Sequence, residues 1–293
     1  MKILPYDLTP DELAFFTPKW TGERFDDGRP RVPDEELDGI ARYSSITHAW
    51  GVCREVGYTR QFLGGFQSTM PGQTMVGRVL TALYLPLLPD TREAMLNAGH
   101  ARGEIGDMIS WPIQRLTERD VYVADVFGKI DDGPIVGERL SSAIYARSHN
   151  GCVHNASVRD IDGIIGIAGF NIFHRGVHPS HASPHTIMLG GINCPTRMEG
   201  VTVMPGDVAL AKGDCVIFIP PHLARGCALS GMVVTYRDRF AMERCSQKVY
   251  TSGEIDAAWR EDIETDFVRW LDDQPDVPFT MEQLELTRSR RLW

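Results

Sequence analysis

Two stretches of the chain carry residues able to bind an anionic substrate and a metal ion. The first, Gly137-Glu138-Arg139-Leu140, leads from an acidic, Gly- and Pro-rich loop into a predicted helix. Helix N-termini have unpaired N–H groups and positive potential, so they bind carboxylates and phosphates. The second stretch is Arg159-Asp160, at the end of an apolar run. Arginine can clamp a carboxylate through its bidentate fork, and aspartate can hold a hard divalent cation, directly or through water.

Arg159 and Asp160 also admit purely structural roles. As neighbours in the chain, the two side chains are expected to point in different directions. Asp160 is a suitable N-cap for a helix that begins at Ile161, and Arg159 could pair with any surface acid. Spacing alone leaves both interpretations open.

The elements that position these residues lie in the middle of the chain. Helical patterns cover residues 92–100, 138–147 and 161–167, between β-rich runs. The β-rich runs are MVGRVLTALYLPL, VYVADVFG, GCVHNASV, NIFHRGVH and GVTVMPGDVALAKGDCVIFIP. This alternation predicts an α/β fold with some parallel pairing, followed by an antiparallel addition with turns at Pro205-Gly206-Asp207 and Gly213-Asp214.

Changes in composition and in secondary-structure pattern along the chain predict three parts. Residues 1–70 form an N-terminal extension with a helix at 34–43, capped by Asp34. Residues 71–245 form the α/β core. Residues 246–293 form a tail with an amphipathic helix from about 252 to 273, which must dock on its own core or on a neighbouring subunit.

Charge, hydrophobic runs and cysteine spacing argue against a nucleic-acid partner, a signal peptide, a membrane span and a disulfide framework. The net charge of -9, without a compensating basic stretch, argues against nucleic acid. The N-terminus lacks the apolar segment of a signal peptide, and no apolar run reaches the length of a membrane span. The six cysteines form no C-x-x-C pair and are expected to be reduced, mostly buried thiols. These features predict a cytoplasmic protein.

The order of these motifs resembles a known family. Gly137-Glu138-Arg139-Leu140, then a helix, a strand and Val158-Arg159-Asp160, is similar to the signature of the RraA-like family. That family contains the 4-hydroxy-4-methyl-2-oxoglutarate/4-carboxy-4-hydroxy-2-oxoadipate aldolases and the regulator of ribonuclease activity A. MVGRVLTA, DVYVAD, FHRGVHP and EGVTVMPGDVALAKGDCVIFIPP also match, so the resemblance covers roughly residues 70–245.

The resemblance implies a swivelling β/β/α fold, an α-β-β-α sandwich, assembled as homotrimers or homohexamers with sites between subunits. The backbone of Gly137, Glu138, Arg139 and Leu140 would bind the substrate's carboxylate. Arg159 would contact a 2-oxo acid, and Asp160 would anchor Mg²⁺ or Mn²⁺, mostly through water. The implied activity is a metal-dependent carbon–carbon lyase: retro-aldol cleavage that gives pyruvate, or decarboxylation of oxaloacetate.

Three positions depart from the family pattern. Asn155-Ala156 stands where family members usually have Asp-Gly, Gly163 where an acid is usual, and Lys212 where another acid is expected. Lys212 is either an exposed turn residue or a contact to a second substrate carboxylate. These departures leave two alternatives: a non-catalytic regulator that binds another protein, and a lyase or hydratase that acts on a sugar-derived acid.

The histidines allow more than one interpretation. His178, His181 and His185 in HPSHASPH could bind zinc, but the prolines and serines around them favour an ordinary polar loop. His154 is expected to be a core histidine. Arg175 is expected to support the site from a neighbouring strand.

Overall fold

The computed structural model describes residues 2–289 of the chain. The helices are α1 (Pro10–Phe16), α2 (Asp34–Tyr43), α3 (Ile46–Glu55), α4 (Pro89–His100), α5 (Trp111–Gln114), α6 (Glu138–Ser148), α7 (Ile161–Ile165), the 3₁₀ turn η1 (Pro221–Leu223), α8 (Ala224–Ser246), α9 (Ser252–Asp256), α10 (Glu261–Asp272) and α11 (Met281–Arg288). The strands are β1 (Phe62–Leu63), β2 (Gln67–Ser68), β3 (Met75–Pro86), β4 (Asp120–Lys129), β5 (Cys152–Val158), β6 (Ile172–Val177), β7 (Ile187–Ile192), β8 (Thr196–Met198), β9 (Val201–Val203), β10 (Val208–Lys212) and β11 (Cys215–Ile219).

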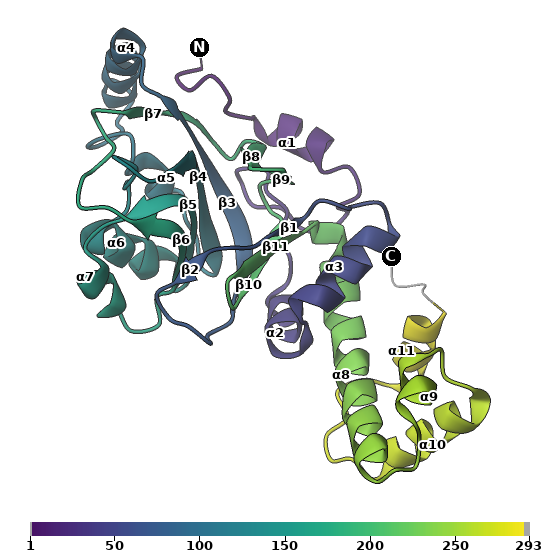
Figure 1. Ribbon diagram of the computed structural model, residues 1–293. Coiled ribbons are helices and arrows are strands. Elements are labelled where there is room, and N and C mark those ends of the chain that lie inside the picture. Colours follow the sequence, from purple (N-terminus) through teal and green to yellow (C-terminus); the bar gives the residue numbers. More distant parts are fainter. Residues whose placement is uncertain (1, 290–293) are drawn as a thin grey trace.

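A mixed sheet forms the centre of the molecule (Figure 1). Within the described residues it has nine strands in the order β1-β11-β10-β3-β4-β5-β6-β2, and β7 pairs with the far end of β3. Strands β3, β4, β5 and β6 are parallel neighbours, whereas β10 and β11 form an antiparallel hairpin beside β3. The predicted α/β fold, with parallel pairing and an antiparallel addition, is confirmed.

Helices α4, α5, α6 and α7 cover one face of the parallel strands. Their apolar side chains pack with those of β3, β4 and β5 in one large cluster that includes Leu80, Tyr122, Ile144 and Val158. All seven residues of β5 are buried. Because β5 is buried on both faces, its sequence GCVHNASV shows no regular alternation of apolar and polar residues, and its polar side chains form hydrogen bonds inside the protein.

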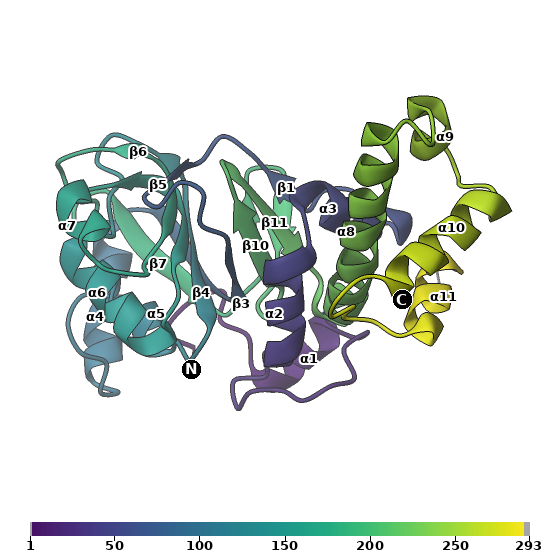
Figure 2. The ribbon, with the colours of Figure 1, turned by 90° about the horizontal axis from the view of Figure 1, so that it is seen from below.

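Helices α2, α3 and α8 cover the antiparallel half of the sheet (Figure 2). The far half of α8 extends beyond the sheet and packs against α9, α10 and α11 around Phe240, Phe267 and Trp270. The amphipathic tail therefore docks on its own chain. The single predicted helix from 252 to 273 is wrong, because the backbone leaves the helix after Asp256 and a new helix begins at Glu261.

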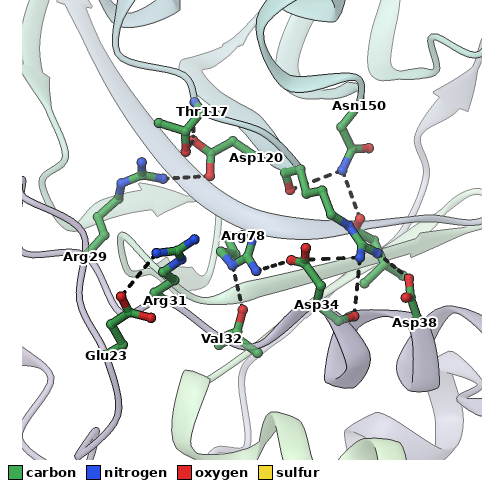
Figure 3. A network of polar contacts seen from close by, with 12 residues as sticks. Glu23, Arg29, Arg31, Val32, Asp34, Asp38, Arg78, Thr117, Asp120 and Asn150 are labelled. Carbon is green, nitrogen blue, oxygen red and sulfur yellow. Dashed lines mark hydrogen bonds and ion pairs between the residues drawn. The ribbon is translucent and has the colours of Figure 1, made fainter.

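Ion pairs attach the N-terminal residues to the core strands (Figure 3). Arg29 donates to the Asp120 carboxylate at 2.9 Å, and both side chains are fully buried. Arg78 pairs with Asp34 and donates to the Val32 carbonyl at 2.7 Å. The prediction that Asp34 caps its helix is wrong: Pro33 is the cap residue, and the Asp34 carboxylate bonds Arg78 instead.

Candidate active site

The carboxyl ends of the parallel strands bring the two predicted stretches together. The loop after β4 ends at Gly137, where α6 begins, and β5 is followed directly by Arg159 and Asp160. The backbone N–H of Arg159 donates to the carbonyl of Val136 at 3.3 Å. This bond joins the loop before α6 to the exit of β5, at the edge of the sheet where α/β folds bind ligands.

Gly137 lies directly against the charged pair. A Cβ built on this glycine would lie 2.6 Å from Asp160 Oδ2 and 3.1 Å from Arg159 Nε. A side chain at this position would displace the Asp160 carboxylate, so glycine lets the start of α6 approach both charged groups as they stand.

Arg159 and Asp160 contact each other, contrary to the expectation that they point apart. Arg159 Nε lies 3.6 Å from Asp160 Oδ2, and the two side chains are 40% and 52% exposed. Asp160 has a φ of 55°, in the left-handed region that aspartate tolerates better than most residues. In this conformation the Asp160 carboxylate lies beside the side chain of the preceding residue.

The capping alternative for Asp160 is only half right. Asp160 does occupy the N-cap position of α7, but its side chain makes no capping hydrogen bond. The carboxylate is directed instead toward Gly137 and Arg159, so helix capping does not explain this residue.

The Glu138 carboxylate is a further acid at this edge. It packs against Gly163, so closely that a Cβ on Gly163 would overlap the carboxylate oxygen. Gly163 follows Asp160 by three residues, which places it one helical turn along the same face of α7. The glycine that departs from the family pattern therefore provides the space that the Glu138 carboxylate occupies.

The start of α6 presents backbone groups to the same region. Its cap residue is Gly137, and no side chain caps the helix. Glu138 and Arg139 are exposed, whereas Leu140 packs partly into the core. Leu140 can therefore serve a ligand only through its backbone N–H, as the prediction for this stretch requires.

A second polar network crosses three neighbouring strands and includes Asn155. Asn155 Nδ2 donates to Asp125 Oδ1 at 2.8 Å, and Asn155 Oδ1 accepts from Arg175 Nε at 3.1 Å. Arg175 also donates to the Gly64 carbonyl at 2.7 Å and to the Glu199 carboxylate at 2.6 Å. Its guanidinium lies 3.7 Å from the centre of the Phe66 ring.

The amide of Asn155 suits this position because it bonds a carboxylate with one end and a guanidinium with the other. Asp125 is nearly buried, and burial raises the pKa of its carboxyl, opposed by the hydrogen bonds from Asn155 and from the backbone of Phe127. An aspartate at position 155 would meet a second carboxylate here. Asp125 was not predicted from the sequence as a functional residue; its only signal was its place at the end of the DVYVAD strand.

The donor set at the edge fits a hard divalent cation that keeps part of its water shell. Within residues 2–289, no group of three or more His, Cys, Asp or Glu side chains is placed to hold a metal ion. Mg²⁺ is often bound through only one or two carboxylates, with water and substrate oxygens as its other ligands. Asp160 and Glu138 supply this kind of donor.

Other residues singled out in the sequence lie apart from this edge or in the core. Lys212 is exposed at the end of β10, beside the two-residue turn Gly213-Asp214, as one of its two interpretations predicts. His154 is fully buried, and burial lowers its pKa to about 3, so it is the expected core histidine. The HPSHASPH segment is a loop, in which His178 bonds Ser180 at 2.7 Å. All six cysteines are free thiols.

No helix among the described residues is both long enough and apolar enough to span a membrane.

Known proteins share the fold and part of the sequence. A solved structure of an uncharacterized protein from Pseudomonas syringae pv. tomato is 21% identical, with a TM-score of 0.61 over 77% of this chain and 98% of that protein. Streptomyces coelicolor RraAS2, described as an unusual member of the RNase ES inhibitor RraA protein family, is 22% identical, with a TM-score of 0.58 over 72% of this chain and 98% of RraAS2. At these identities the likeness shows the fold.

Protein DlpA of Legionella pneumophila is 27% identical over 160 residues, which are 54% of this chain and 24% of DlpA. The chain thus spans about a quarter of that relative. The family model RraA-like (Aldolase/RraA) matches residues 44–218, well over half of the chain, and this range contains both predicted stretches. The chain therefore belongs to the RraA-like family.

Proposed function

We propose that this protein is a divalent-metal-dependent carbon–carbon lyase that acts on a 2-oxo acid. The observation that carries the proposal is the meeting of Arg159, Asp160 and the start of α6 at one edge of the sheet. The family includes both metal-dependent aldolases and regulators without catalytic activity. The assembled charged groups favour the enzymatic alternative.

The positive groups at this edge suit an anionic substrate. The start of α6 offers backbone N–H groups and the positive end of the helix dipole to a carboxylate. The Arg159 guanidinium is partly exposed, and its ion pair with Asp160, at 3.6 Å through Nε, is the one that the described residues form with it, so most of its donors are left for a ligand. Together these groups would bind the 2-oxo carboxylate end of the substrate.

Asp160 and Glu138 would hold Mg²⁺ or Mn²⁺, with water and the substrate's 2-oxo carboxylate as the other ligands. When bound, the metal withdraws electrons from the C2 carbonyl of the substrate. The Arg159 guanidinium stabilises the negative charge that develops on the enolate oxygen. In retro-aldol cleavage a base would remove the proton from the C4 hydroxyl, the C3–C4 bond would break, and C4 would become the carbonyl carbon of the second product. The pyruvate enolate that leaves would then take up a proton at C3 to give pyruvate. Decarboxylation of oxaloacetate would break its C3–C4 bond, release CO₂ and give the same enolate.

The proposed site is open in the single chain, because Arg159, Asp160 and Glu138 are all partly or largely exposed. We propose that a neighbouring subunit of a homotrimer or homohexamer closes it. Such closure would remove water from the charged groups and strengthen their electrostatic effect.

Pyruvate release tests the proposal. The full chain is assayed with 4-hydroxy-4-methyl-2-oxoglutarate and with oxaloacetate, in Mg²⁺ or Mn²⁺ and then in EDTA. We expect metal-dependent turnover that falls by at least about 100-fold in Asp160→Asn and Arg159→Ala. Asn tolerates the left-handed backbone of position 160, so Asp160→Asn changes charge with little strain. Asp90→Asn, an exposed acid on α4, is the matched control and should retain activity.

A negative result has a definite meaning. If neither substrate gives metal-dependent pyruvate release, or if Asp160→Asn is as active as the wild type, the lyase proposal is wrong. A stoichiometric protein partner recovered by the full chain, together with no metal binding by calorimetry, would then favour the regulator.

A further inference from the structure

A cavity of 260 Å³ lies on the antiparallel half of the sheet, between the N-terminal segment and the η1 turn. Four residues with aromatic rings, Phe16, Trp20, Tyr58 and His222, are among those that line it, together with Asp207. Its volume is slightly below the roughly 300–1,000 Å³ of pockets for drug-sized ligands, so it suits a small molecule. It shares no residue with the proposed active site.

Asp207 is an isolated acid in this cavity. Its side chain is only 2% exposed and accepts one hydrogen bond, from the backbone N–H of Met204 at 2.9 Å. Among residues 2–289, no Lys, Arg or His nitrogen lies within 4 Å of its carboxyl oxygens. Burial raises the pKa of Asp207 to about 8. Without a cationic partner the buried carboxyl is held mainly in its neutral form, and a cation bound beside it would favour the carboxylate.

The aromatic lining supplies the remaining part of a cation site. The Tyr58 and His222 rings lie 5.7 Å apart at 56°, and the indole of Trp20 is held by its bond to the Glu23 carbonyl at 2.8 Å. The negative faces of such rings attract ammonium groups, and aromatic cages recognise quaternary ammonium ligands in this way. A carboxylate at the base of such a cage adds the counter-charge.

We propose that this cavity binds a small organic cation with an ammonium group, for which the Asp207 carboxylate is the counter-ion. The ligand's alkyl groups would contact the rings of Trp20, Tyr58 and His222. The inference does not depend on the proposed lyase activity.

Three other ionisable groups face the cavity: Tyr58, His222 and Lys19. Burial raises the pKa of Tyr58, and burial followed by the nearby Lys19 lowers the pKa of His222, so both rings are neutral between pH 7 and pH 9. Lys19 is exposed at the rim, and its positive charge opposes cation binding. Removal of that charge in Lys19→Gln should therefore tighten binding.

Cation binding requires ionised Asp207 and so releases a proton. With a pKa of about 8, about a tenth of the molecules carry the carboxylate at pH 7, and most do at pH 9. The dissociation constant of a cation that does not itself titrate should therefore be about tenfold lower at pH 9 than at pH 7.

Isothermal titration calorimetry of the full chain with choline tests the proposal, and 3,3-dimethylbutan-1-ol serves as the neutral isostere. We expect choline to bind about tenfold more tightly at pH 9 than at pH 7, and the isostere to bind far more weakly at pH 9. Asp207→Asn keeps the acceptor for the Met204 N–H but should lose choline binding. Asp214→Asn, an exposed acid on the same hairpin, is the matched control.

Thermal unfolding of Asp207→Asn shows whether a loss of binding reflects unfolding. The proposal is overturned if choline does not bind the wild type at pH 9, if the isostere binds as well as choline, or if folded Asp207→Asn binds choline like the wild type.

Discussion

Restoring the family's acid at position 155 should destabilise this protein at neutral pH. The Asn155→Asp change places a carboxylate beside Asp125 Oδ1, which now accepts a hydrogen bond from Asn155 at 2.8 Å. Both positions are almost fully buried. Arg175 now bonds Asn155, and Arg197 lies near enough to lower the pKa of Asp125, so the two acids would share these two cations.

The size of the effect follows from these contacts. Loss of a hydrogen bond to a charged group costs about 1.5–3 kcal/mol. Two carboxylates about 4 Å apart repel by about 4 kcal/mol at an effective dielectric constant of 20. The new attraction between the introduced carboxylate and Arg175 offsets part of this. We therefore expect the free energy of unfolding to fall by about 2–4 kcal/mol at pH 7.

The loss should depend on pH with a definite sign. Repulsion raises the apparent pKa of the carboxyl pair in the folded protein above that of an unfolded aspartate, about 3.9. The folded state then holds a proton that the unfolded state has released, so the deficit grows as pH rises above about 4. Below about pH 4 the deficit should vanish.

Urea unfolding of the wild type and Asn155→Asp at pH 7 and pH 4.5 measures the effect. The swap Asp125→Asn with Asn155→Asp restores one acid beside one amide and should recover most of the stability, as a double-mutant cycle. A variant as stable as the wild type at pH 7, a deficit unchanged at pH 4.5, or a swap as unstable as the single change would refute the reasoning.

Three further changes have defined outcomes. Gly163→Ala should displace the Glu138 carboxylate and weaken Mg²⁺ binding measured by calorimetry, while the free energy of unfolding changes by less than about 1 kcal/mol, because alanine suits a helix better than glycine. In the folded protein the pKa of Asp207 is about 8, above the reference value of 3.8, so its ionisation destabilises the fold at neutral pH. Asp207→Asn removes this ionisation and should raise the free energy of unfolding by up to about 4 kcal/mol at pH 7, and by nothing below about pH 4. Equal gains at pH 4 and pH 7 in urea titrations would contradict this. Burial lowers the pKa of His48 to about 4, so between pH 6.5 and pH 4 the unfolded chain binds a proton that the folded protein does not. The free energy of unfolding therefore falls as pH falls through this range. In His48→Gln this fall should be shallower by up to about 1.4 kcal/mol per pH unit, as measured by urea unfolding.

Local patterns predicted the central strands and helices well, because each has a clear local cause. The helix predicted at residues 34–43 coincides with α2, and the predicted β-rich run GCVHNASV contains β5. The loop-to-helix entry at Gly137 was predicted from the acidic, Gly- and Pro-rich loop that precedes it, and α6 begins there. Side-chain roles were predicted less well: Asp34 bonds Arg78, a residue 44 positions away, rather than its own helix.

The parts that sequence did not predict depend on contacts between distant segments. The helix α8 was not predicted. One half of it packs against the sheet and α2, and the other half packs against α10 and α11. Its apolar residues therefore do not form the single stripe that marks an amphipathic helix. The network of Asp125 and Arg175 joins residues from three strands, and no spacing within one strand indicates it. Such features arise from tertiary packing.

The departures at positions 155 and 163 share one physical consequence. Each places a neutral residue directly beside an acid from another element: Asn155 beside Asp125, and Gly163 against Glu138. An acid at either position would form a close carboxylate pair, which needs a cation or a shared proton. Fewer ligand charges weaken the binding of a divalent cation. Under the proposed function, the metal would therefore depend more strongly on the carboxylate and 2-oxo oxygens of the substrate, so metal and substrate should each raise the other's affinity by the same factor.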